Sequence, residues 1–292
     1  MNIVSYAWFR SSTSVYESSG WNFRKVGLQF MQFLPLLVRA HFEVWSRWVL
    51  RIHHDDRVRE LPYFKALEGL RRNGLLDLIY TGPCESLCGV TGMLSRLNPV
   101  FEEGVEYVAC RDVDSVPMAK DRRAVEDFIL SWKAVHCSHD AEGHAGLMGG
   151  LTTVHAERFR QITKVSSVAE LVAKYGPAFD YKVHGADQHL LNQIAVRELG
   201  PSNLVVHDLH HEVGDLKADV RTKIEAPVPC DVAADVAKEG DVLSPIMGGC
   251  YEPLKAFEFY DSIRSPLNSH IREIERQAGV DAHKMMREIA AL

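Results

Sequence analysis

The chain has 292 residues, of which 46% are hydrophobic and 25% are charged. These proportions are those of an ordinary globular protein, and they exclude a disordered or collagen-like chain. The length accommodates one large α/β domain or two smaller ones. Because 33 basic residues stand against 39 acidic ones, the formal net charge is -6, and we expect no broad basic surface for nucleic acid.

The cysteines and the apolar segments indicate the cellular compartment of the protein. None of the six cysteines, at positions 84, 88, 110, 137, 230 and 250, forms a C-x-x-C pair, which argues against a zinc ribbon or a thioredoxin-type site. Reduced, mostly buried thiols fit a cytoplasmic protein. The first apolar run is too short for a secretory signal, and the most lipid-like stretch, 26–38, is uncharged but has only 13 residues where a membrane span needs about 20. The aromatic segment 26–48 could touch a membrane surface, with core burial as the simpler interpretation.

Short apolar runs alternate with helical patterns along the first two hundred residues, which predicts βαβ units in a mainly parallel sheet. Extended segments are expected at residues 3–7, 49–53, 76–80, 105–110, 134–137, 152–154 and 205–207. Helices are expected at residues 28–40, 62–72, around 87–94, 122–133, 187–198 and 268–289. Pro35 should kink or break the first of these helices, and residues 227–249 have the composition of a loop-rich connection.

Two acids follow the buried strand predicted at 105–110. Residues 111–115 read Arg-Asp-Val-Asp-Ser, and the carboxyl edge of a parallel sheet is where ligands bind. Alternate residues of an extended segment share a face, so Asp112 and Asp114 should repel each other unless a cation lies between them. Mg²⁺ or Mn²⁺ would suit such a pair and would complete its coordination with phosphate oxygens. The alternative is that this short pattern occurs by chance.

A second candidate lies at the start of the helix predicted at 187–198. Residues 186–192 read Ala-Asp-Gln-His-Leu-Leu-Asn, which places Asp187 and Gln188 in the first turn. The amides of a helix N-terminus attract negative charge and can orient a ligand. The alternative is a structural helix cap formed by Asp187.

Glycines and histidines complete the candidate set. Gly149 and Gly150, in the run 146–150, would let the backbone approach a ligand, or they form an ordinary turn. His207 and His210 lie in a histidine-rich segment that could supply an imidazole to a divalent cation, although a surface or core histidine is commoner. The run 53–56, His-His-Asp-Asp, was interpreted as polar lining at a strand end rather than as a metal cluster.

In order and spacing, these three motifs resemble the nucleotide-sugar glycosyltransferases of the GT-A fold. The run 187–192 resembles the DQDxLN segment of the glycogenin and lipopolysaccharide galactosyltransferase family, and residues 146–151 stand where that family has its N-[SA]-G-V turn. The run 111–115 is similar to the RDxDS form of the DxD motif in bacterial and viral glycosyltransferase-like domains. The resemblance covers about residues 1–210, with His189 in place of the family's second acid and no HxxGxxKPW element.

The resemblance implies a GT-A fold, with a mixed, mainly parallel sheet flanked by helices, as a catalytic domain over 1–215 and a C-terminal extension over 216–292 packing on it. It implies a hexosyltransferase that moves a sugar from a nucleoside diphosphate donor to a glycan, lipid-linked or protein acceptor. The implied metal ligands are Asp112, Asp114 and either His207 or His210. Candidate nucleotide contacts are Tyr6, Ala7, Arg10, Asp55 or Asp56, Arg111, Val113, Gly149 and Gly150.

The stereochemical course leaves two assignments open. If the reaction inverts the anomeric centre, Asp187 would take the acceptor proton, with Asp140 as the second candidate. If the reaction retains it, Gln188 would lie beside the reacting face and Asp187 would orient sugar hydroxyls. Two other functions were weighed. A sugar nucleotidyltransferase should carry a glycine-rich basic loop after the first strand, where residues 8–20 hold only Arg10 and Gly20, and a degenerate transferase-like domain would bind a glycan or a partner without turnover.

Overall fold

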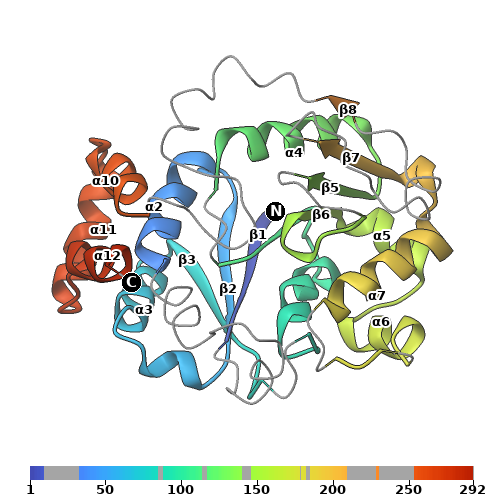
Figure 1. The fold of residues 1–292 in the computed structure, drawn as a ribbon, viewed down its shortest axis with the longest axis horizontal. Helices are drawn as coiled ribbons and strands as arrows, with labels where there is room; N and C mark the ends of the chain where they lie inside the picture. The colour runs from blue at the N-terminus through green and yellow to red at the C-terminus, as the bar shows by residue number, and fades with distance from the viewer. Residues whose placement is uncertain are drawn as a thin grey trace.

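One mixed sheet carries the fold (Figure 1). The computed structural model describes residues 1–9, 33–84, 88–113, 117–139, 146–177, 179–181, 185–208, 228–229 and 253–291. Within them the strands lie in the order β3-β2-β1-β4-β6-β5-β7-β8. They are β1 (Asn2–Trp8), β2 (Val49–His54), β3 (Leu76–Tyr80), β4 (Tyr107–Arg111), β5 (Val135–His139), β6 (Thr152–His155), β7 (Leu204–Asp208) and β8 (Val228–Pro229). Every pairing is parallel except those of β6, which runs antiparallel to β4 and β5. The predicted class, α/β with a mixed, mainly parallel sheet, is confirmed.

Helices cover both faces of this sheet. The α-helices are α2 (Leu34–Val44), α3 (Phe64–Arg72), α4 (Ala119–Ser131), α5 (Ala156–Thr163), α6 (Val168–Tyr175), α7 (Ala186–Ile194), α10 (Pro253–Ser262), α11 (Pro266–Gln277) and α12 (Ala282–Ala290). The shorter or tighter turns are η3 (Arg57–Glu60), η4 (Met93–Phe101), η5 (Gly149–Leu151), the π-helical η6 (Ala195–Leu199) and η7 (Pro201–Asn203). Among the helices described, none is long and apolar enough to cross a bilayer.

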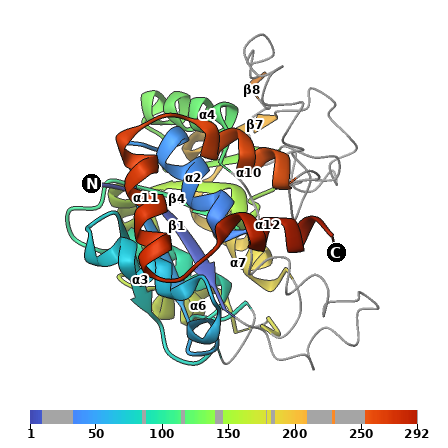
Figure 2. The same ribbon diagram turned by 90° about the vertical axis from the view of Figure 1, so that its left-hand side faces the viewer.

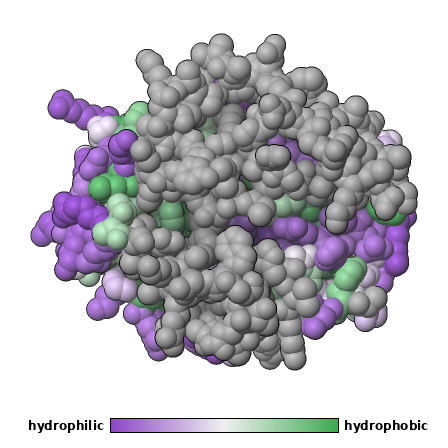
Figure 3. Space-filling model, viewed as in Figure 1, coloured by the Kyte–Doolittle hydropathy of each residue, from purple (hydrophilic) through white to green (hydrophobic). Residues whose placement is uncertain are grey.

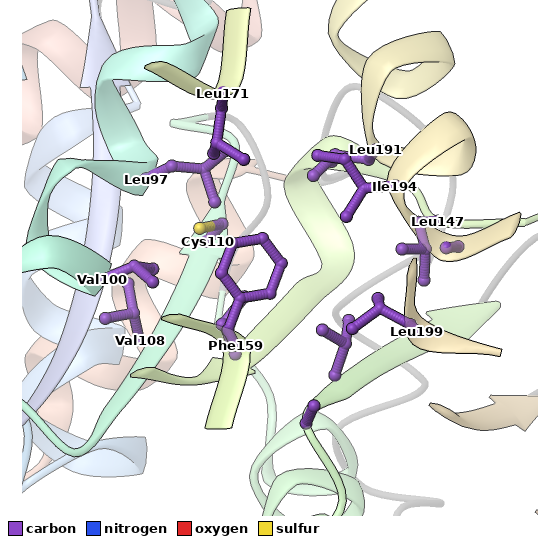
Figure 4. Packing of buried hydrophobic residues seen from close by; sticks show 14 of the residues in the cluster. Leu97, Val100, Val108, Cys110, Leu147, Phe159, Leu171, Leu191, Ile194 and Leu199 are labelled. Atoms are coloured by element: carbon purple, nitrogen blue, oxygen red, sulfur yellow. The ribbon is translucent and has the colours of Figure 1, made fainter. Parts of the chain in front are cut away.

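The first face of the sheet is covered by η4, α5, α6 and α7. Its core gathers around Phe159 of α5, which lies among Leu97 of η4, Cys110 of β4 and Leu171 of α6 (Figure 4). Leu191 belongs to the same cluster and packs α7 against it. This packing holds the N-terminal turn of α7 and the start of η4 over the carboxyl end of β4.

The opposite face is covered by α2, α3 and α4. Tyr6 and Trp8 of β1 and Ile52 of β2 are buried there against apolar side chains of these helices. Since Ile3 and Cys110 belong to the first core, successive strand residues alternate between the two faces. A strand residue can therefore be assigned to a face from its neighbours.

The three C-terminal helices pack beside α2 and α3 at one side of the sheet (Figure 2). Their outer surface is largely hydrophilic in Figure 3, at the left of the view. Arg39 of α2 ties them down: its guanidinium donates to Asp261 of α10 at 2.8 Å and to Glu275 of α11 at 2.6 Å. The Tyr63 hydroxyl also donates to Glu275 at 2.5 Å. The boundary expected between the catalytic domain and the C-terminal extension, after residue 215, falls outside the described residues.

Several predicted helices differ in extent from those observed. Pro35 lies in the first turn of α2 instead of kinking a helix, because the missing amide of proline is harmless there. The single terminal helix expected at 268–289 is two helices, since Gly279 adopts a φ of +71° between α11 and α12. α5, α6 and α10 were not predicted.

Arg39 gives a first prediction. Its side chain is 1% exposed and its partners Asp261 and Glu275 are 10% and 5% exposed. Replacing it leaves the buried Glu275 without its counter-charge, whereas Asp261 keeps Arg272 at 3.3 Å. Arg39→Ala should lower the free energy of unfolding by about 3–5 kcal/mol, measured by urea denaturation. Arg276→Ala, which removes an exposed partner of Glu273 on α11, is the matched control and should change it little. Equal effects of the two substitutions would contradict the role of Arg39.

His41 of α2 gives a second prediction, which concerns the pH dependence of stability. Burial lowers the pKa of His41 from 6.5 to about 4, although its ring nitrogen lies 3.1 Å from the Trp48 carbonyl oxygen. Between these values the unfolded chain binds the extra proton, so the free energy of unfolding should fall as pH drops from about 6.5 toward 4. The contribution of this one group reaches about 3 kcal/mol.

Denaturation curves between pH 7 and pH 4.5 would measure that slope. His41→Gln keeps an amide donor for the Trp48 carbonyl and cannot take up a proton, so its slope should be shallower. His270→Gln, at an exposed position of α11, is the control and should leave the slope as it is. An unchanged slope in His41→Gln would show that the acid sensitivity arises elsewhere.

Candidate active site

The antiparallel strand β6 brings two of the predicted motifs together. Asp112 follows the last residue of β4, and η5, which begins with Gly149 and Gly150, leads directly into β6. Because β6 runs antiparallel to β4, its entry lies beside the exit of β4. The glycine turn and the strand-end acid therefore meet at the carboxyl edge of β4, although some 37 residues separate them in the sequence.

Arg96 of η4 joins this acid to the third motif. One guanidinium nitrogen, Nη1, donates to Oδ1 of Asp112, and the other, Nη2, donates to Oδ2 of Asp187 at 2.9 Å. The side chains of Arg96 and Asp187 are 5% and 7% exposed, whereas that of Asp112 is 38% exposed. The arrangement is an acid–arginine–acid bridge, buried at one end and open at the Asp112 end.

The glycines are required by this bridge. A Cβ on Gly150 would collide with the carboxylate of Asp112. A Cβ on Gly149 would collide with the guanidinium of Arg96 and lie 2.6 Å from Oδ2 of Asp187. The backbone of η5 thus packs directly against the charged groups, and a side chain at either position would displace them.

A further contact ties the segment before the glycine turn to α7. Gly146, with a φ of +68°, leaves room for the side chain of Asn192, whose Oδ1 accepts the amide of Leu147 at 2.9 Å. Asn192 is the last residue of the DQDxLN-like run. Both ends of that run therefore contact the segment 146–150.

Electrostatics in the bridge follow from burial. Burial by itself would lower the pKa of Arg96, and the neighbouring carboxylates of Asp112 and Asp187 more than offset this, so the pKa lies above its ordinary value and the guanidinium stays charged. Cys88 is buried beside the first turn of α7, where burial and the charge of Asp187 raise its pKa to about 11. That thiol is therefore neutral at physiological pH.

Ala7 lies in the same row of the sheet as Asp112. In the parallel register Ala7 is paired with His53 of β2, and Tyr6 with Arg111 of β4, so the residues after them, Ala7 and Asp112, are neighbours on the η4 face. His53 is buried, and burial together with Arg51 lowers its pKa to about 3. Ala7 is thus a small residue between a neutral imidazole and the candidate acid.

Other predicted contacts serve the interior. Arg111 is fully buried on the face that carries α4 and donates through two nitrogens to Asp121, both at 2.8 Å. Tyr6 lies on that same face with no exposed surface, where burial raises its pKa. Asp55 is buried and accepts the amide of Val58 at 3.2 Å in a local turn. Arg111 and Tyr6 are therefore not presented at the Asp112 face, because both side chains are enclosed on the face that carries α4.

His207 is not brought to Asp112. Its ring lies on the α4 face, 5.0 Å from the ring of His136 and 3.9 Å from the carboxylate of Asp127, on the opposite side of the sheet from Arg96. The structure therefore does not bring His207, one of the two histidines implied as a metal ligand, to the end of β4 where Asp112 lies. In the described parts of the chain no three His, Cys, Asp or Glu side chains form a group that could hold a metal ion.

Four predicted site residues lie outside the described residues, namely Arg10, Asp114, Asp140 and His210. Val113 is described, half-buried, and packs against the core on the α2 and α3 face. Arg96 was not predicted at all. It stands in a segment whose apolar spacing shows only a helix, and a buried arginine has no local sequence signature.

The comparisons with known proteins include solved structures that match this chain. Neither the protein-family models nor the curated protein sequences contain a match to this chain. A crystal structure of the galactosyltransferase LgtC, in complex with donor and acceptor sugar analogues, is similar with 13% sequence identity and a TM-score of 0.43, over 93% of this chain and all of that one.

The contact between Gly150 and Asp112 can be tested by a double-mutant cycle. Gly150→Ala should destabilise the protein, by about 1–3 kcal/mol, because the new methyl group overlaps the carboxylate. In an Asp112→Ala background the same substitution should cost distinctly less, since the overlapping atoms are gone. Free energies of unfolding of the four proteins measure the coupling, and strict additivity would contradict the packing described here.

Proposed function

We propose that this protein is a glycosyltransferase that moves a sugar from a nucleoside diphosphate donor to a hydroxyl acceptor. One observation carries the proposal: the strand-end acid Asp112, the glycine turn at Gly149 and Gly150, and the helix-start acid Asp187 meet around Arg96. The sequence alone predicts these three segments as parts of one site. Their convergence at the carboxyl edge of a mainly parallel sheet, where α/β proteins bind ligands, supports a shared site.

The chemistry of Asp112 supports a divalent cation beside the diphosphate. Its side chain is 38% exposed and its pair with Arg96 uses one carboxylate oxygen, Oδ1, so a cation can reach the carboxylate from solvent. We assign Asp112 and Asp114 as the protein's carboxylate ligands to Mn²⁺ or Mg²⁺. Such a cation would neutralise the charge that develops on the departing diphosphate. His207 has no part in this assignment.

Arg96 and Asp187 are assigned to the donor sugar. Asp187 is buried in the first turn of α7 and is held by Arg96, so its position is set before any ligand binds. A fixed carboxylate of this kind orients sugar hydroxyls better than it serves as a mobile base. Gln188, half-buried at the next position, is assigned to the reacting face of the sugar. This choice corresponds to the retaining alternative.

In the transfer itself, the acceptor oxygen bonds to the anomeric carbon while the bond from that carbon to the diphosphate oxygen breaks. The electron pair leaves with the diphosphate, and the acceptor gives up its proton. The residues described here position the donor for this step. Arg96 holds the carboxylates of Asp112 and Asp187 in place, and the backbone of Gly149 and Gly150 allows the donor to approach closely. Ala7, beside Asp112 in the sheet, is assigned to the nucleoside.

The test is a panel of nucleotide sugars with Mn²⁺, in which released nucleoside diphosphate is measured with and without candidate sugar acceptors. Release from at least one donor is expected. Tight binding of a donor without release would favour a binding domain that has lost catalysis. If no sugar nucleotide is bound or hydrolysed, the proposal fails.

A matched pair of variants tests the assignment of Asp112. Asp112→Asn should reduce cation-dependent binding of the donor at least about tenfold, because a neutral amide is a poor ligand for a hard cation. The fold should persist, since the side chain is at the surface end of the bridge. Asp77→Asn removes a carboxylate that also pairs with a buried arginine, Arg51, but at the amino-terminal end of β3, and should leave binding unchanged. Titration calorimetry on both variants decides, and normal binding by Asp112→Asn would exclude this residue as a ligand.

A further inference from the structure

The bridge has a property that the proposed function does not require. Without a ligand, Asp112 is already neutralised by Arg96, an internal cation. A divalent ion that approached Asp112 would meet a carboxylate with one oxygen engaged and a guanidinium charge directly behind it. Two positive centres on one carboxylate repel each other, and burial strengthens that repulsion because the local dielectric is low.

Arg96 cannot simply move away. Its side chain is 5% exposed, and its second nitrogen is held by Asp187. Leu94 and Leu97, on either side of it in η4, belong to the buried core, and its backbone carbonyl oxygen accepts from the thiol of Cys110 at 3.5 Å. Displacing the guanidinium would leave the buried Asp187 without its counter-charge, which is costly. The positive charge therefore stays in place when ligands bind.

A nucleoside diphosphate changes this balance. Its phosphate oxygens bring negative charge to the exposed side of Asp112, which offsets the repulsion between a divalent ion and Arg96 and completes the coordination of that ion. Cation and diphosphate should then each raise the affinity of the protein for the other, by the same factor.

From this we infer that Arg96 is a positioning residue that suppresses cation binding to the empty site, so that the divalent ion binds together with the diphosphate of the donor. The inference rests on the proposed function. It assigns to Arg96 a role in the order of binding, in addition to holding the two acids.

The experiment measures Mn²⁺ binding by electron paramagnetic resonance of the free ion, for the full chain, alone and with ADP, GDP, UDP or CDP. For the wild type, the affinity for Mn²⁺ alone should be at least about tenfold weaker than with the best diphosphate. Arg96→Met should raise the affinity for Mn²⁺ alone about tenfold, because Asp112 and Asp187 become an unpaired acid pair, and should reduce the effect of the diphosphate. Simple damage to the structure would lower the affinity, not raise it.

Two further variants keep the outcome clear. Arg96→Gln removes the charge but keeps a polar group for the two acids, and it should shift Mn²⁺ affinity in the same direction if Arg96→Met does not fold. Combining Asp112→Asn with Arg96→Met should abolish the gained affinity, which places the gain at Asp112.

The possible failures are distinguishable. If the wild type binds no Mn²⁺ with any of the four diphosphates, the proposed function fails. If the wild type binds Mn²⁺ with a diphosphate through Asp112, and neither Arg96→Met nor Arg96→Gln binds Mn²⁺ alone more tightly, the proposed function stands and the inference about Arg96 is overturned.

Discussion

The arrangement of side chains at the carboxyl end of β4 depends on the guanidinium of Arg96. It is the counter-charge for two acids that come from different elements, one at the end of a strand and one at the start of a helix. Without it, Asp112 and Asp187 would repel, and the buried Asp187 would be uncompensated. Gly149 and Gly150 of η5 have no side chains, which lets their backbone pack against this bridge. Fold and candidate site are therefore joined through one side chain.

The direction of one strand explains why these residues meet. In a purely parallel sheet, the chain leaving β4 would return through a crossover, and the entry to the next strand would lie at the opposite edge. Because β6 is antiparallel, its entry turn, Gly149–Leu151, is placed beside Asp112. The mixed sheet is thus a requirement of the site and not an incidental feature of the topology.

The sequence predicted the strands well because their signal is local. The runs that became β1, β2 and β3 are short, apolar and bounded by turn residues, and the observed bounds differ from the predicted ones by at most one residue. The motif residues Asp112, Asp187 and Gly150 could also be found, since each follows or precedes such an element. The partners across the sheet could not, because Arg96 and Asp121 are recognised only when the layers that carry them are packed together.

The failure to predict α6 and the misplacement of His207 have different causes. Residues 167–170 read Ser-Val-Ala-Glu, with Ser167 as the N-cap of α6, and the Ser167 hydroxyl accepts the amide of Glu170 at 3.1 Å. A capping signal for this helix is therefore present in the sequence. His207 was misassigned for a reason that no local pattern corrects. Its position in the chain fits a ligand, but the alternation of side chains along β7 directs it to the α4 face.

Buried arginines recur in this protein, and they differ in what their acids can reach. Arg39 and Arg111 pair with acids that are themselves enclosed, at 5–11% exposure, so those bridges can only join layers of the fold. Arg51 has exposed partners, but they lie along the strands and beyond η4, away from the carboxyl edge. Arg96 alone among these four holds one enclosed acid and one exposed acid at that edge, beside a glycine turn. An ion pair with an arginine is therefore compatible with a binding site when one of its acids still faces solvent at the place where ligands bind, and Asp112 meets both conditions.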